Sequence, residues 1–82
     1  MKRIVLVPDV IWEQWPRAAV EYGKRELCKQ GWEPVLGPAG TPVAKRQGRI
    51  ESAHHGDIDI AAQGLVALVY EAQEKQPALD PE

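Results

Sequence analysis

Six consecutive apolar residues, Leu65 to Tyr70, most constrain the fold of this chain. In a helix these side chains would point in every direction, and a helix that is apolar all round must be buried all round. A chain of 82 residues acting alone cannot supply that much cover. We therefore predict a strand over residues 65–70, with a short helix over 58–63 before it and a helical turn over 71–76 after it.

Two other arrangements of this region remain open. A single helix from about Asp57 to Gln76 would gather most of its apolar residues on one face. A hairpin of residues 49–53 with residues 57–61 would use the alternation of aspartate and isoleucine over residues 57–60.

The first half of the chain has the pattern strand, helix, strand. Residues 4–7 are a continuous aliphatic run that Pro8 closes, which is typical of a strand buried on both faces. Pro16 opens a helical pattern that Gly31 ends with a left-handed cap. Residues 32–36 then predict a second short strand. A helix that connects two strands of one sheet favours a parallel pair, so we expect a small α/β fold: a three-stranded, mainly parallel sheet with one long helix and one or two short helices.

We expect a single α/β domain over residues 1–76 and a flexible tail over residues 77–82. Ordering a chain of this size costs roughly 1.5 kcal/mol per residue, so its stability margin is thin. A sheet this narrow cannot bury both faces with the helices available. The size therefore predicts that a partner completes the core, most simply a second copy in a homodimer.

Charge is distributed unevenly along the chain. Residues 1–50 carry nine Lys/Arg and five Asp/Glu, a net +4, whereas residues 51–82 carry one lysine and seven acids, a net −6. Such asymmetry can steer a charged partner, but we favour the other interpretation, in which the two halves attract each other within the fold. We expect no nucleic-acid partner, because nucleic acid requires a denser basic surface and the acidic half would repel phosphates.

The cysteine count and the first residues indicate a cytoplasmic protein. Cys28 is the single cysteine, so no internal disulfide can form, and we expect its side chain to be buried or half-buried. The apolar run after the N-terminus ends at Pro8, which is too early for a signal peptide or a membrane span.

Several segments together give the chain a family resemblance. They are the aromatic-proline pair Trp15-Pro16 at a helix start, residues 31–39 (GWEPVLGPA), and residues 57–64 (DIDIAAQG) leading into residues 65–70. Over residues 3–71 this order resembles the nucleoside 2-deoxyribosyltransferase-like group. The resemblance implies a flavodoxin-like fold and an enzyme that cleaves or transfers the glycosidic bond of deoxynucleosides through a carboxylate nucleophile.

Two departures from the group bear on activity. Its first strand usually runs into a loop that contains Gly-Pro, where this chain has Val-Pro-Asp-Val over residues 7–10, and the region that carries the nucleophilic glutamate has no counterpart here. No catalytic residue is therefore carried over to this chain.

In an open parallel sheet, ligands bind at the carboxyl ends of the strands. Those ends would be Asp9, the loop around Gly40 and Thr41, and Glu71. The two carboxylates could work together as acid and base on a sugar, and the glycine loop could hold an anion through its N–H groups. The same residues also suit a helix cap, a turn and a solvated surface.

We expect no metal and no cofactor. His54 and His55, with the aspartates that follow, suggest a metal site. Adjacent side chains, however, point about 100° apart on a helix and to opposite faces of a strand, so both imidazoles seldom reach one ion.

The aromatic residues and one basic loop suggest an interaction surface. The chain has three tryptophans and no phenylalanine, and two of the tryptophans flank the connection from the first strand to the long helix. Exposed tryptophan is enriched at binding hot spots. The residues that we expect at a protein interface are Ile11, Trp12, Trp15, Lys45, Arg46 and Arg49.

The leading hypothesis is a small non-enzymatic cytoplasmic protein that binds another protein, of the kind that bacteria and phages use as accessory factors or inhibitors. The alternative is a minimal nucleoside- or nucleotide-handling enzyme with Asp9 and Glu71 in its site.

Overall fold

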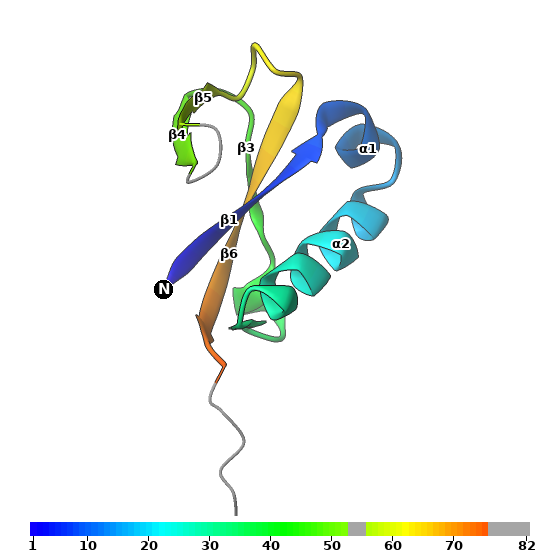
Figure 1. The fold of residues 1–82 in the computed structure, drawn as a ribbon. Helices are drawn as coiled ribbons and strands as arrows, with labels where there is room; N and C mark the ends of the chain where they lie inside the picture. Colours follow the sequence, from blue (N-terminus) through cyan, green and yellow to red (C-terminus); the bar gives the residue numbers. More distant parts are fainter. Residues whose placement is uncertain (53–55, 76–82) are drawn as a thin grey trace, which may run out of the picture.

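The structure is a computed structural model, and it describes residues 1–52 and 56–75. In this part of the chain a four-stranded sheet packs against two helices, and a two-stranded hairpin lies beside it (Figure 1). The elements in chain order are β1 (Lys2–Pro8), α1 (Asp9–Gln14), α2 (Pro16–Lys29), β2 (Trp32–Pro34), the short 3₁₀ helix η1 (Pro38–Gly40), β3 (Val43–Lys45), β4 (Arg49–Ser52), β5 (Gly56–Asp59) and β6 (Leu65–Glu74).

Strand β6 is the centre of the sheet. Along one edge it pairs with β1, from Lys2 opposite Glu71 to Pro8 opposite Leu65. Along its other edge it pairs with β3 through residues 67–69 and with β2 through residues 72–74. All three pairings are antiparallel. Ten residues of β6 thus hold together three separate segments of the chain.

The expected mainly parallel sheet of three strands is wrong, and the flavodoxin-like fold is wrong with it. Strands β1 and β2 do run parallel to each other, since both are antiparallel to β6, as a helical crossover requires. They are not neighbours, however, because β6 lies between them. This is a split βαβ arrangement, in which the last strand of the chain fills the gap between the first two.

The predicted strand over residues 65–70 is confirmed, but it continues to Glu74. The helical turn expected over residues 71–76 is therefore wrong. The short helix expected over residues 58–63 is also wrong, because a turn occupies residues 60–64 and β5 comes before it. The structure has the hairpin alternative, with Ile50 opposite Ile58.

The long helix is confirmed from end to end. Pro16 is the first residue of α2, and Gly31 follows its end with φ 90°, the left-handed conformation that glycine adopts at little cost. Ala19, Gly23 and Leu27 form its buried face. Cys28 is exposed, so the expectation of a buried or half-buried thiol is wrong.

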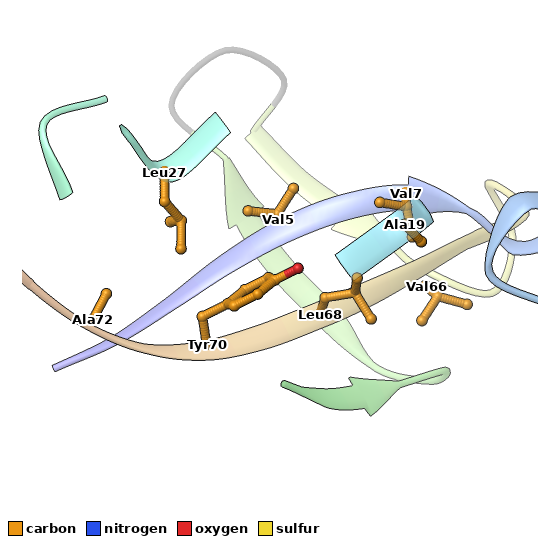
Figure 2. Close-up of a cluster of buried hydrophobic side chains, with 8 residues drawn as sticks. All are labelled: Val5, Val7, Ala19, Leu27, Val66, Leu68, Tyr70 and Ala72. Atoms are coloured by element: carbon orange, nitrogen blue, oxygen red, sulfur yellow. The ribbon is translucent and has the colours of Figure 1, made fainter. Parts of the chain in front are cut away.

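The core lies between α2 and one face of the sheet. Figure 2 shows its eight buried side chains, which come from β1, α2 and β6. They are Val5, Val7, Ala19, Leu27, Val66, Leu68, Tyr70 and Ala72. The odd-numbered residues of β1 and the even-numbered residues of β6 therefore face α2, and the others face away.

Some expectations concern residues outside the described ranges: His54, His55 and the tail over residues 77–82. Within those ranges, no helix is long and apolar enough to cross a bilayer.

Candidate functional site

The face of the sheet opposite α2 carries a row of three aliphatic side chains, Ile4, Val69 and Val43. Ile4 of β1 and Val43 of β3 both lie directly opposite Val69 of β6, one on each edge. Directly opposite residues project to the same face of a sheet. Ile4 is 42% exposed and Val43 67% exposed, while Val69 between them is half-buried. We call these three residues the open row.

The neighbouring part of the same face is covered. The next row along the sheet begins with Leu6 opposite Ala67, and Ala67 is fully buried. Ile58 of β5 lines a pocket together with Leu6 and Leu65, so the β4–β5 hairpin covers this end. In Figure 1 the hairpin and α2 lie on opposite sides of the crossing strands β1 and β6. At the β1 end of the open row, Ile4 lines a groove together with Ile50 of β4, yet 42% of Ile4 stays exposed.

A hollow of about 440 Å³ lies at the β3 side of the open row. Its lining combines the aliphatic side chains of Val43 and Val69, which we call its floor, with charged side chains from β1, β3 and β6, which we call its rim. The lining residues are Lys2, Thr41, Val43, Ala44, Lys45, Val69, Tyr70 and Glu71. An apolar floor with a charged rim is the usual anatomy of a protein-binding surface.

The rim has a cationic character. The carboxylate of Glu71 accepts a hydrogen bond of 2.9 Å from the N-terminal amine of Met1. That hydrogen bond, and then the charge of the amine, lower the pKa of Glu71. Neither Lys2 nor Lys45 forms an ion pair with another described residue. The two lysines therefore remain available to meet acidic groups.

The predicted ligand site does not assemble. Asp9 follows the last residue of β1, whereas Glu71 lies opposite Lys2 at the start of β1. Six residues of strand separate the two ends, about 20 Å. Thr41 and Glu71 do line the same hollow, but Asp9 does not reach it. Gly40 lies in η1, packed against the main chain of Val35.

The predicted interface residues between β1 and α2 differ in their exposure. Ile11 and Trp12 lie on α1 and pack, half-buried, against the core. Trp15, between α1 and α2, is 55% exposed. Trp15 is thus the one member of this trio with a large free surface.

Two cations of the predicted basic loop are neutralised within the chain. Arg46 Nη1 lies 3.3 Å from Asp9 Oδ1 and 3.4 Å from Glu13 Oε1. Arg49 Nη1 lies 3.2 Å from Asp57 Oδ2 across the hairpin. These pairs are exposed and each contributes little to stability. Among the predicted cations only Lys45 borders the open row.

The expected attraction between the basic and acidic halves is present at two places. Arg49 with Asp57, and the amine of Met1 with Glu71, join residues 1–50 to the acidic second half. The other described ion pairs lie within residues 1–50.

Sequence reasoning did not identify Ile4, Val43 and Val69 as an exposed group. The aliphatic run over residues 4–7 predicts a strand buried on both faces, and one long helix can cover only one of them. The sequence therefore did indicate that one face of the sheet lacks a helix to cover it. It could not name Val43 or Val69, because their alignment with Ile4 depends on the antiparallel register of β6.

Across residues 1–52 and 56–75, no three His, Cys, Asp or Glu side chains are grouped to hold a metal ion. No family model matches the chain, and no curated protein or solved structure is significantly similar to it.

Proposed function

We propose that this chain is a non-enzymatic protein-binding domain that acts in the cytoplasm through the open row. The observation that carries the proposal is the exposure of Ile4 and Val43 on either side of Val69, on a face that the chain's own helices leave uncovered. Burial of aliphatic surface by a partner contributes about 25 cal/mol of binding free energy for each Å² of apolar surface removed from water. A cytoplasmic site agrees with the single, exposed thiol of Cys28.

The rim defines the chemistry of the partner. Lys2 and Lys45 flank the apolar floor from two sides, and both are exposed. The complementary surface is one or two aliphatic side chains with carboxylates beside them. Opposite charges at the rim of an interface speed association and select against basic partners.

The enzyme alternative lacks a site in this fold. A nucleoside-handling enzyme of the expected kind requires Asp9 and Glu71 in one place, and the antiparallel register holds them at opposite ends of β1. Nothing in the described residues supplies a second carboxylate beside Glu71 in the hollow.

A photo-crosslinking amino acid at Thr41, on the rim of the hollow, tests the proposal in cells. When the rest of the chain is unchanged, we expect the crosslinker to form a covalent adduct with another protein. Adding Val43→Glu to the same chain should abolish that adduct. Val10→Glu is the matched control, because Val10 is also an exposed valine, 60% against 67%, and lies on α1 away from the hollow. Both substitutions should change the free energy of unfolding by less than about 0.5 kcal/mol. Equal adduct yield in all three proteins would refute the open row as the binding surface.

A further inference from the structure

We infer that two copies of this chain pair through the free edge of β1 and form one continuous sheet across a two-fold axis. The inference concerns the edge of the sheet, whereas the proposed function concerns its face. Either can therefore hold without the other.

The hydrogen bonds at the two ends of β1 show which backbone groups are free. The N–H of Ala72 donates to the carbonyl of Met1 at 2.9 Å, and the N–H of Asp9 donates to the carbonyl of Gly64 at 2.9 Å. In an antiparallel ladder, alternate residues bond to the partner strand. Odd-numbered residues of β1 therefore bond to β6, and the N–H and C=O groups of Lys2, Ile4 and Leu6 point outward.

No described strand pairs with this outer edge. Edge strands usually carry prolines, bulges or inward charges that prevent pairing with another chain. Here the edge is aliphatic from Ile4 to Val7 and is interrupted by Pro8 only at its last residue. Its outward N–H and C=O groups can pair with another strand.

The outward groups are self-complementary. When a second β1 runs antiparallel with Ile4 opposite the partner's Ile4, Lys2 lies opposite the partner's Leu6. This register makes three residue pairs across the axis, and the two residues of each pair exchange two N–H···O=C hydrogen bonds. The dimer would therefore gain six hydrogen bonds. Pro8, which has no N–H to donate, lies outside these pairs. A contact of this kind is isologous and closes as a dimer.

A groove runs beside this edge and gives an incoming strand a place. It has a volume of about 340 Å³ and is lined on one side by β1, including Lys2, Ile4 and Leu6. Gln30 at the end of α2 and Ile50 of β4, which belong to the two opposite faces of the sheet, complete its lining. A strand added here would lie about 4.8 Å from β1.

Charge complementarity selects a second copy as the occupant. The start of β1 is basic through Lys2, whose side chain projects to the same face of the sheet as Leu6, whereas the Arg3 guanidinium lies 4.3 Å from the Trp32 ring on the face toward α2. The β4–β5 hairpin lies beside Leu6 and, over its described residues, carries three acids and one arginine. Those acids are Glu51, Asp57 and Asp59. A two-fold axis at Ile4 brings the basic start of each β1 next to the acidic hairpin of the partner.

The same register joins the two open rows. Across the axis, Ile4 would lie beside the partner's Ile4. The two open rows would then form one row of six aliphatic side chains on one face of the continuous sheet. Cross-strand pairs of β-branched residues, here Ile4 with the partner's Ile4, stabilise a sheet. A strand from an unrelated protein would not in general extend the open row in this way.

The test is the mass of the full chain by sedimentation equilibrium over a wide range of concentration. We expect a reversible dimer. Ile4→Lys and Ile4→Glu each place two like charges opposite each other at the axis and should raise the dimer dissociation constant about tenfold. An equimolar mixture of the two variants should restore dimers, because opposite charges then face each other. Val10→Lys, at an exposed valine on α1 away from this edge, is the control and should dimerise as the parent does.

A second pair of variants covers the case in which changes at Ile4 alter the fold, which far-UV circular dichroism would reveal. Lys2→Pro removes one outward N–H at the start of the strand and should weaken the dimer, whereas Lys2→Ala keeps that N–H and should not. A parent chain that stays monomeric at every concentration, a mixture that fails to restore dimers, or an equal loss with Val10→Lys would each overturn the inference.

Discussion

The ring of Tyr70 occupies the space where position 23 would carry a side chain. Gly23 lies on the buried face of α2, and a Cβ built there would lie 2.6 Å from Tyr70 Cζ and closer still to its hydroxyl oxygen. The hydroxyl donates a hydrogen bond of 2.8 Å to the main-chain carbonyl of Val20, one turn earlier on the helix. The helix and the central strand are thus joined at one glycine, and Figure 2 shows the Tyr70 ring projecting from β6 among the core side chains.

Gly23→Ala should destabilise the protein although alanine favours helices. The added methyl gains about 1 kcal/mol in helix propensity, but overpacking against a fully buried ring costs about 1–3 kcal/mol or more. We expect a net loss of about 2 kcal/mol in the free energy of unfolding, measured by urea denaturation. In a Tyr70→Leu background the same substitution should become stabilising. A loss of the same size in both backgrounds would show that the ring is not the cause.

Tyr70 should make the protein sensitive to alkaline pH. Burial, with a smaller effect from the charge of Glu21, raises the pKa of Tyr70 to about 12. A raised pKa means that the folded state keeps this proton after the unfolded chain, with a pKa near 10, has lost it. The stabilisation is fully present below pH 10 and is lost as pH rises through 12, a change of about 2–3 kcal/mol.

Tyr70→Phe should remove this pH dependence, at a cost of about 1 kcal/mol at neutral pH from the lost hydrogen bond. The measurement is the free energy of unfolding from pH 8 to 12 in both proteins. Tyr22→Phe, on the exposed side of α2, should retain the alkaline loss because Tyr70 is still present. Parallel pH profiles for Tyr70→Phe and the parent would contradict this account.

Gly40→Ala should be more damaging than a glycine substitution in a nearby turn. A Cβ at position 40 would lie 2.6 Å from the carbonyl carbon of Val35 and nearer to its oxygen. The obstacle is main chain, and the N–H of Val35 donates to the carbonyl of Glu71 at 2.9 Å, so a shift would loosen the end of β2 from β6. We expect a loss of about 3 kcal/mol in thermal or urea unfolding.

Gly37→Ala is the control for Gly40→Ala. Gly37 has φ 84° and ψ −169°, an extended conformation with positive φ that is essentially restricted to glycine, but open space around it, so alanine there costs only the backbone strain, about 1–3 kcal/mol. Equal losses at the two positions would mean that the contact with Val35 has no energetic weight.

The elements predicted well are those that local signals determine. Pro16 and Gly31 mark the two ends of α2, and the apolar run over residues 65–70 could only be a strand in so short a chain. These signals act within a few residues, and propensity and capping express them directly. The extension of β6 to Glu74 escaped prediction because Glu71, Ala72 and Gln73 favour helix when taken alone. Pairing with β1 and β2 overrides that preference.

The direction and position of β6 could not be obtained from the sequence. The chain connection from β1 through α2 to β2 is the same whether the two strands are neighbours or are separated by a third. The candidate site depended on this choice. A parallel neighbour would have brought Asp9 and Glu71 to one end of the sheet, whereas the antiparallel β6 carries Glu71 to the far end and aligns Val69 with Ile4 and Val43.

The two tryptophans that flank the connection into α2 should respond differently to truncation. Trp12 packs half-buried against the core, so Trp12→Ala should cost about 2–3 kcal/mol in urea denaturation. Trp15 is 55% exposed, and its hydrogen bonds to Ile11 and from Ala19 use main-chain atoms that alanine keeps. Trp15→Ala should therefore cost less than about 1 kcal/mol. If so, any change in partner binding or self-association in Trp15→Ala can be assigned to the surface, whereas the same change in Trp12→Ala would reflect the fold. Similar losses of stability for the two variants would place Trp15 in the core instead.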